Sequence, residues 1–172
     1  MDSTQLFNLV PWVVFLPLIG LGINLLIGKK LGEVFAGTVA SLATGLVFVV
    51  SILLAVALIG HPEGTTVVLG DWITIGDLTT RWAFRVDTLS VVMMLTVNCV
   101  GLLIHIYSIG YMHDDVRHNG DTARFTRFFV FLNFFILVMM LLVSADNFLM
   151  MFVGWEGVGL CSYLLIGFWF EK

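Results

Sequence analysis

The sequence predicts an all-α polytopic membrane protein of about five transmembrane helices, with an external β-hairpin between the second and the third. Of its 172 residues, 59% are hydrophobic and only 12% are charged, and the mean hydropathy is +1.04. An ordinary soluble domain is about one quarter charged. Several uncharged stretches exceed about 18 residues, which is roughly what a helix needs to cross the hydrocarbon core of a bilayer. We therefore expect residues 1–172 to form a single membrane domain.

Five apolar stretches give the expected helices and, with the positive residues, their orientation. The helices are expected at about residues 10–27, 34–59, 86–111, 125–143 and 148–170. Six positive residues fall on one side of this arrangement, and only Arg81 and Arg85 fall on the other. The six are Lys29, Lys30, Arg117, Arg124, Arg127 and Lys172. Because cytoplasmic segments carry the excess of Lys and Arg, we expect an external amino terminus and a cytoplasmic carboxyl terminus.

The external loop, residues 61–85, contains two strand-like runs. Residues 71–75 and 78–82 are rich in Thr, Ile and Trp and flank the pair Gly76-Asp77. Such runs around a two-residue turn with glycine are typical of a β-hairpin. An isolated hairpin is only marginally stable in water, so we expect this one to lie against the external ends of helices or against a neighbouring subunit. An irregular loop is the alternative.

Glu156 is the clearest candidate for a functional residue. A helix over 148–170 has its centre at Gly159, so a rise of about 1.5 Å per residue places Glu156 within roughly 5 Å of the membrane mid-plane. A carboxyl at that depth is either protonated or held charged by a cation. It can serve as a proton relay or only fasten two helices, and the residues alone leave both roles open. No Lys or Arg lies deep in the five stretches, so a cationic partner must come from outside this chain.

Five further residues could belong to a proton path. His105, in the inner half of the third helix, could pass a proton or be a packed, hydrogen-bonded side chain. Asp87 and Asp146 precede the third and fifth helices, where each could be an N-cap or an outer entry point for protons. Ser162 and Tyr163 follow Glu156 by one or two turns and could extend a hydrogen-bonded wire.

Composition and spacing exclude several other kinds of site. A net charge of −4 without a basic cluster offers no electrostatic footprint for nucleic acid. Two widely separated cysteines give neither a disulfide framework nor a metal-ligand spacing. The glycines around Glu156 follow no strand, so they fail the context of a phosphate-binding loop and instead permit close helix packing. We expect no metal and no cofactor to be bound by this chain.

Residues 154–168, GWEGVGLCSYLLIGF, together with SADN at 144–147 and DTLS at 87–90, resemble the antiporter-like L subunit of respiratory complex I. This enzyme is the proton-pumping NADH:quinone oxidoreductase, and the mitochondrial counterpart of the subunit is subunit 5. The predicted hairpin, the run HIYS at 105–108 and the pattern of spans agree with the resemblance along essentially the whole chain.

The resemblance implies a partial antiporter-like fold and a role in the membrane arm, coupling NADH:quinone electron transfer to outward proton pumping across a bacterial cytoplasmic membrane. Glu156 falls on the functional fifth-helix glutamate of the family, which favours the relay. NADH, flavin, iron-sulfur clusters and quinone would belong to other subunits, and the chain itself would carry no redox site. Expected partners are the lipid bilayer, other antiporter-like subunits and the remainder of the same subunit, because family members are much longer. The chain is thus expected to be an amino-terminal fragment or a split-gene product.

Two other functions remain open at this point. The A subunit of multisubunit sodium/proton antiporters shares these helices and a related glutamate, although the hairpin and the sequence of the fifth helix favour complex I. A structural membrane fragment without transport activity is the other alternative, with Glu156 only fastening helices.

Overall fold

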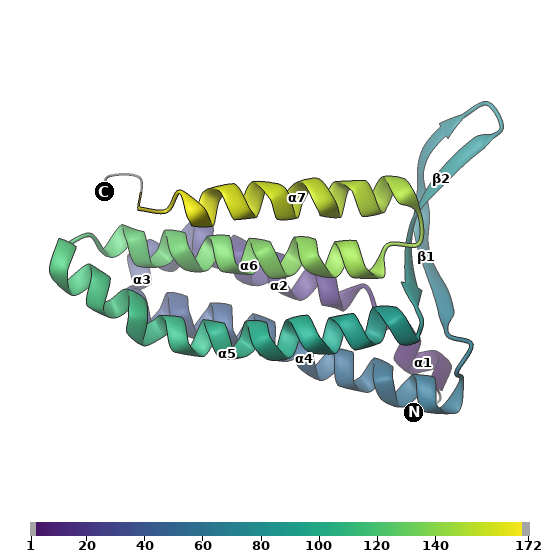
Figure 1. Ribbon diagram of the computed structural model, residues 1–172, viewed down its shortest axis with the longest axis horizontal. Helices are drawn as coiled ribbons and strands as arrows, with labels where there is room; N and C mark the ends of the chain where they lie inside the picture. Colours follow the sequence, from purple (N-terminus) through teal and green to yellow (C-terminus); the bar gives the residue numbers. More distant parts are fainter. Residues whose placement is uncertain (1–2, 170–172) are drawn as a thin grey trace.

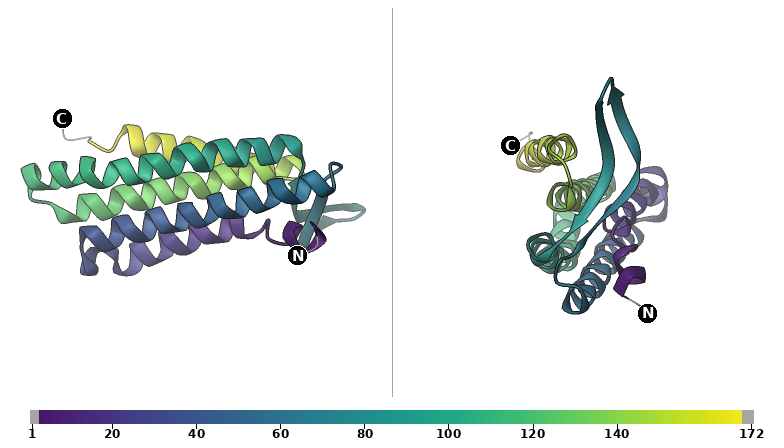
Figure 2. Two further views of the ribbon diagram at one scale, coloured as in Figure 1. Left: turned by 90° about the horizontal axis from the view of Figure 1, so that it is seen from below. Right: turned by 90° about the vertical axis from the view of Figure 1, so that its right-hand side faces the viewer.

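The computed structural model describes residues 3–169, and in this part five helices are long and apolar enough to cross a membrane. They lie side by side, with a two-stranded hairpin at one end of the bundle (Figures 1 and 2). This architecture confirms the predicted fold class. In chain order the elements are α1 (Ser3–Phe7), α2 (Trp12–Ile23), the π-helical turn η1 (Asn24–Gly28), α3 (Lys29–Leu31), α4 (Glu33–Gly60), β1 (Thr65–Ile75), β2 (Leu78–Val86), α5 (Thr88–Asn119), α6 (Thr122–Ser144) and α7 (Phe148–Ile166).

The first span is longer than the predicted helix. It runs over Gln5–Leu31 rather than 10–27. Leu6 and Phe7 precede the predicted start but are buried in the core. The π-helical turn continues α2 and places Asn24, also fully buried, against α4. The Nδ2 group of Asn24 donates to the carbonyl of Ala36 at 3.0 Å. A polar side chain with a partner on the next helix is thus tolerated inside the span.

The predicted connector between the third and fourth spans is largely helical. α5 continues past residue 111 to Asn119, and α6 begins at Thr122 instead of 125. Gly120, at φ +72°, ends α5 in the left-handed conformation that glycine adopts without strain. The carboxylate of Asp121 then caps α6 by accepting from the Ala123 N–H at 2.9 Å. Hydropathy marks where a helix leaves the apolar layer, not where it ends, and this explains the difference.

Helix α7 ends at Ile166, four residues before the predicted end. Gly167 follows, and its N–H bonds back to the carbonyl of Tyr163 at 3.0 Å. The predicted end, Phe170, and the carboxyl-terminal Lys172 lie outside the described residues. The shorter helix is centred on Gly157 rather than on Gly159.

The hairpin forms around the predicted turn, with longer strands than expected. β1 and β2 pair antiparallel from Thr65↔Val86 to Ile75↔Leu78. Gly76 has φ +58°, as the first central residue of a type II′ two-residue turn requires. The base of the hairpin joins the bundle through a bridge between Phe84 and Ala145, and its tip projects beyond α7 (Figure 1). The prediction that the hairpin lies against helix ends is therefore confirmed for its base.

The helices pack unequally. α2, α4, α5 and α6 contact one another in a four-helix arrangement, whereas α7 lies at the edge and packs mainly against α6, as the end view shows (Figure 2). One face of α7 is therefore covered by the chain and the opposite face is not.

Candidate functional site

Glu156 lies in the middle of α7, one residue from its centre, and its side chain is exposed. At about 1.5 Å per residue it is even closer to the mid-point of the span than the sequence predicted. Within residues 3–169 it has no hydrogen-bond or ion-pair partner. A carboxyl at this depth and without a partner is costly in a bilayer. The rest of α7 shows which way it faces.

The face of α7 that points away from Glu156 packs closely against α6 through glycines. A Cβ atom on Gly154 would lie 2.7 Å from the Cα of Leu142, and one on Gly157 would lie 2.5 Å from Cγ1 of Val138. These contacts confirm that small residues here permit close helix approach. Gly159 differs, because a Cβ atom on it would meet nothing within 4 Å.

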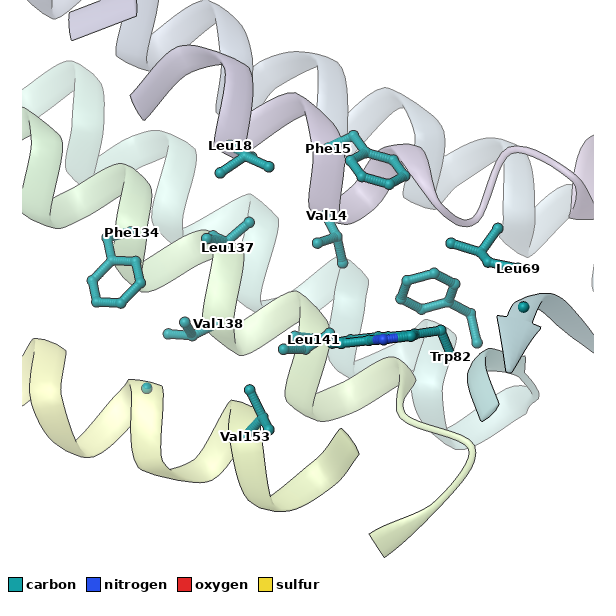
Figure 3. Close-up of a pocket in the computed structure, with 13 residues that line it drawn as sticks. Val14, Phe15, Leu18, Leu69, Trp82, Phe134, Leu137, Val138, Leu141 and Val153 are labelled. Carbon is teal, nitrogen blue, oxygen red and sulfur yellow. The ribbon is translucent and has the colours of Figure 1, made fainter. Parts of the chain in front are cut away.

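An apolar pocket of about 610 Å³ flanks α7 on another side. The close-up shows side chains from α2, the hairpin, α6 and α7 converging on it, with Leu69 and Trp82 of the hairpin at one end (Figure 3). From α7 it receives Val153 and Gly157, but not Glu156. This pocket therefore does not supply a partner for the carboxyl.

Only one of the two predicted wire residues shares the face of Glu156. Tyr163 follows by seven residues, which is about two helical turns, and its side chain is 76% exposed. Ser162 points elsewhere, because its hydroxyl donates to the carbonyl of Val158 at 2.9 Å and its side chain is partly buried. The structure thus groups Tyr163, and not Ser162, with the carboxyl.

His105 lies in a different cluster. It is 1% exposed and within two residues of the centre of α5, closer to the middle than the sequence placed it. Its Nδ1 is 2.7 Å from the carbonyl of Gly101, and its Nε2 is 3.3 Å from Oγ1 of Thr44 and 3.2 Å from Oδ1 of Asn133. These partners belong to α4, α5 and α6, and none to α7. His105 and Glu156 are therefore not joined in one polar group, and sequence reasoning missed Thr44 and Asn133 because neither ionises.

Asp87 caps α5, which confirms the first of the two roles that the sequence left open. Its Oδ1 accepts from the backbone N–H of Ser90 at 2.9 Å, and the Ser90 hydroxyl accepts from the backbone N–H of Asp87 at 2.8 Å. This reciprocal pair is a capping box. The Ser90 N–H, assisted by the Arg85 guanidinium 3.0 Å away, holds the pKa of Asp87 below its usual value, although partial burial acts in the opposite direction.

The capping prediction for Asp146 was wrong, because Asn147 caps α7 instead. The Oδ1 atom of Asn147 accepts from the backbone N–H of Met150 at 3.0 Å. Asp146 binds the hairpin: its N–H donates to the carbonyl of Ala83 at 3.1 Å, and Thr66 donates to its Oδ1 at 3.1 Å. Asp and Asn are about equally good N-caps, so their adjacency left the sequence ambiguous.

No group of three or more His, Cys, Asp or Glu side chains in the described part of the chain is placed to hold a metal ion. The site thus consists of an exposed mid-helix carboxyl with Tyr163 on its face, and of a separate buried histidine.

Two family models match the chain. Residues 72–129 match the amino terminus of chain 5 of NADH-ubiquinone oxidoreductase, complex I. Residues 145–172, which include Glu156, match the transmembrane model described as NADH:quinone oxidoreductase/Mrp antiporter. The first model is described by complex I alone, and it covers the hairpin from residue 72 onward, α5 and the start of α6.

Curated relatives agree with these models. The chain is 45% identical over 130 residues to NADH-quinone oxidoreductase subunit L of Rhodobacter capsulatus, which covers 75% of this chain and 18% of the relative. It is 38% identical over 160 residues to NADH-ubiquinone oxidoreductase chain 5 of Podospora anserina, covering 93% and 24%. Subunit L of Neisseria meningitidis serogroup B is 39% identical over 164 residues, covering 93% and 23%.

The chain thus spans between 18% and 24% of the length of these relatives. Five membrane-capable helices make it an integral membrane protein. Its sequence, matched along most of its length, belongs to the family of NADH-quinone oxidoreductase subunit L and NADH-ubiquinone oxidoreductase chain 5.

Proposed function

We propose that this chain forms the amino-terminal part of a proton-translocating membrane-arm subunit of NADH-quinone oxidoreductase, with Glu156 as a proton relay. The observation that carries the proposal is the position of Glu156, at the middle of a membrane-capable helix, exposed and without a partner in the described residues. An ionisable group of this kind marks a proton or ion pathway more often than it faces lipid.

The uncovered face of α7 supports a partner from elsewhere in the complex. α7 is held to α6 by Gly154 and Gly157, so Glu156 cannot turn inward without breaking that contact. Relatives of this chain are about four times as long, and their additional segments can cover this face. A Lys or Arg there would stabilise the charged carboxylate, and its withdrawal would favour protonation. Alternation between the two states is what a relay requires.

The redox chemistry belongs to other subunits in this proposal. NADH, flavin, iron-sulfur clusters and quinone would be bound outside this chain, which would respond to electron transfer through its contacts in the membrane arm. Other antiporter-like subunits and the remainder of the same subunit are the proposed partners. A role in a sodium/proton antiporter receives less support, because the model matching 72–129 is described by complex I alone.

The orientation is also proposed, with the hairpin outside and the α5–α6 turn in the cytoplasm of a bacterial cell. Cysteine variants at Arg117 and at Glu63, in a background without Cys99 and Cys161, should react with a membrane-impermeant thiol reagent from opposite sides. Both side chains are exposed. Arg117 lies near the end of α5, and Glu63 lies between α4 and β1. Labelling of both from one side would overturn the orientation.

The substitution Glu156→Gln tests the relay, because it preserves shape and hydrogen bonding and removes the titration. In inverted membrane vesicles supplied with NADH, we expect the assembled complex to pump fewer protons for each NADH oxidised. Glu63→Gln, an exposed glutamate before β1, is the matched control and should pump normally. Normal pumping by the Glu156→Gln complex would overturn the relay, and failure of that complex to assemble would favour a fastening role.

A further inference from the structure

Polar side chains cross the interior of the bundle in three layers. Along α6 the layers fall at 126, 133 and 140, and along α5 two of them fall at 98 and 105, so successive layers are two helical turns or about 10.5 Å apart. The layer nearest the hairpin is Ser51, Asn98 and Met140; the middle layer is Thr44, His105 and Asn133; the third is Asn24 with the Ala36 carbonyl, beside Thr126. Of these three layers, only the middle one contains an ionisable side chain, His105.

Each layer has a fully buried amide with one polar atom that lacks a partner. In the described residues these atoms are Oδ1 of Asn24, Oδ1 of Asn98 and Nδ2 of Asn133. Buried polar atoms without partners are uncommon and call for an explanation. In the middle layer the histidine provides one.

The hydrogen bonds at His105 depend on its charge. Nδ1 must donate, because the Gly101 carbonyl 2.7 Å away can only accept. Thr44 donates its hydroxyl hydrogen to the carbonyl of Ala40 at 3.1 Å, and Asn133 turns its Oδ1, an acceptor, toward Nε2. An Oδ1 that faces Nε2 suits a ring that donates from both nitrogens, which is the imidazolium form.

A half-turn of the Asn133 amide satisfies the neutral ring equally well. The Nδ2 group would then donate to Nε2, which accepts in the neutral form. In the orientation observed, Nδ2 instead points toward α2, where a Cβ atom on Gly20 would lie 2.9 Å from it, and it has no partner there. The Asn133 amide therefore has two orientations. One suits the charged histidine and the other suits the neutral histidine.

We propose that Thr44, His105 and Asn133 form a proton-binding site inside the bundle, in which the Asn133 amide turns over when His105 gains or loses its proton. The site is distinct from Glu156 and does not depend on its role, because its partners come from α4, α5 and α6 only. When Nε2 takes up a proton, the new N–H group donates a hydrogen bond to Oδ1 of Asn133. When the proton leaves, Nδ2 of the turned amide donates a hydrogen bond to Nε2.

Other charges are remote from this site. Glu33 is eleven residues from Thr44 along α4 and pairs with His113 near the far end of α5, and Arg127 is six residues from Asn133 along α6. Residues 5–28, which include α2, carry no ionisable side chain. α7 contributes only Glu156, on its outward face, and Asp87 caps the opposite end of α5. The charge of His105 therefore depends on the burial of the ring and on the hydrogen bonds of its own layer.

The test uses the full chain in lipid bilayers, with ¹⁵N-labelled histidine and solid-state NMR. Ring ¹⁵N signals separate imidazolium from neutral imidazole, and loss of a signal in His105→Gln assigns it. We expect the His105 signals of the wild-type chain to pass from the charged to the neutral form between about pH 5 and 9. A single charge state over that range would overturn the proposal.

Two variants of Asn133 should shift this titration in opposite directions. Asn133→Leu removes the acceptor for Nε2–H, so we expect the neutral form throughout the range. Asn133→Asp has nearly the same shape and supplies a carboxylate that only accepts, so we expect the charged form to persist to higher pH. Asn98→Leu removes the corresponding amide from the neighbouring layer and should titrate as the wild type does. Titration of both Asn133 variants at the wild-type pH would overturn the proposal, and should the Leu variant not fold, the Asp variant decides alone.

Discussion

Helices α5 and α7 have the same plan and different surroundings. Each begins at the hairpin end with a side-chain cap and holds one ionisable group near its middle, His105 in α5 and Glu156 in α7. Three helices contribute partners to His105, whereas Glu156 is exposed and has none in the described residues. Position along the helix therefore does not decide what such a group requires. The number of helices that the chain itself places around it does.

The largest expected effect on the free energy of unfolding distinguishes His105 from Glu156. In the isolated chain, His105→Leu leaves the buried Thr44 and Asn133 without their partner and should lower the free energy of unfolding by about 2–3 kcal/mol. Glu156→Leu should cause no comparable loss, because Glu156 has no hydrogen bond or ion pair within residues 3–169. Reversible unfolding in mixed lipid and detergent micelles measures both. An equal loss in the two variants would mean that Glu156 has a partner within this chain.

A smaller effect should distinguish the two faces of α7. Gly154→Ala places a methyl group against the backbone of Leu142 and should cost about 1–3 kcal/mol, as overpacking does. Gly159→Ala enters open space in this chain and should be neutral or slightly stabilising. The same unfolding measurement applies. If Gly159→Ala instead prevents assembly of the whole complex, the uncovered face of α7 is a contact surface there.

The cap of α7 should respond at about 1 kcal/mol. Asn147→Ala removes the acceptor for the Met150 N–H and also the exposed bond from its own amide to the Arg81 carbonyl, and should destabilise by at least about that amount. Asp146→Ala removes only an exposed hydrogen bond from Thr66 and should cost less than about 0.5 kcal/mol. Measured unfolding free energies in the reverse order would restore Asp146 as the cap.

The smallest effect concerns the cap of α5. Asp87→Asn keeps a capping oxygen and loses the exposed pair with Arg85, so near neutral pH the change should be about 0.2–1 kcal/mol. The pKa of Asp87 is lower in the folded state than its usual value. Its contribution is therefore complete above about pH 3.9 and is lost as the pH falls through the lowered pKa. Unfolding measured across that acid range should be less pH-dependent in Asp87→Asn than in the wild-type chain, and an unchanged profile would contradict the assignment.

Some of this structure could be read from the sequence because it depends on local chemistry. Charge-free length gave the five spans, Gly76 gave the turn of the hairpin, and Asp87 followed by Ser90 gave a cap. Helix ends were less accessible, since α5 continues through the polar residues Arg117 and His118 after it has left the apolar layer.

The candidate site was only half predictable. The depth of Glu156 follows from the helical rise, but the face it occupies does not, because α7 is apolar around its whole circumference and only the packing of Gly154 and Gly157 orients it. Asn133 and Thr44 escaped notice because a search for ionisable groups passes over amides and hydroxyls. Their seven-residue spacing from Met140 and Ser51 was the available signal.

The short link between α6 and α7 has a consequence for how the protein is made. Ala145 pairs with Phe84, Asp146 bonds to Ala83, and the amide of Asn147 donates to the carbonyl of Arg81 at 2.8 Å. β2 is synthesised before α7 and, once the hairpin has formed, offers these backbone groups as fixed hydrogen-bonding partners. Helix α7 is thus anchored at its N-cap, Asn147, while it inserts, and the depth of Glu156, nine residues after Asn147, is set by a strand translated about seventy residues earlier.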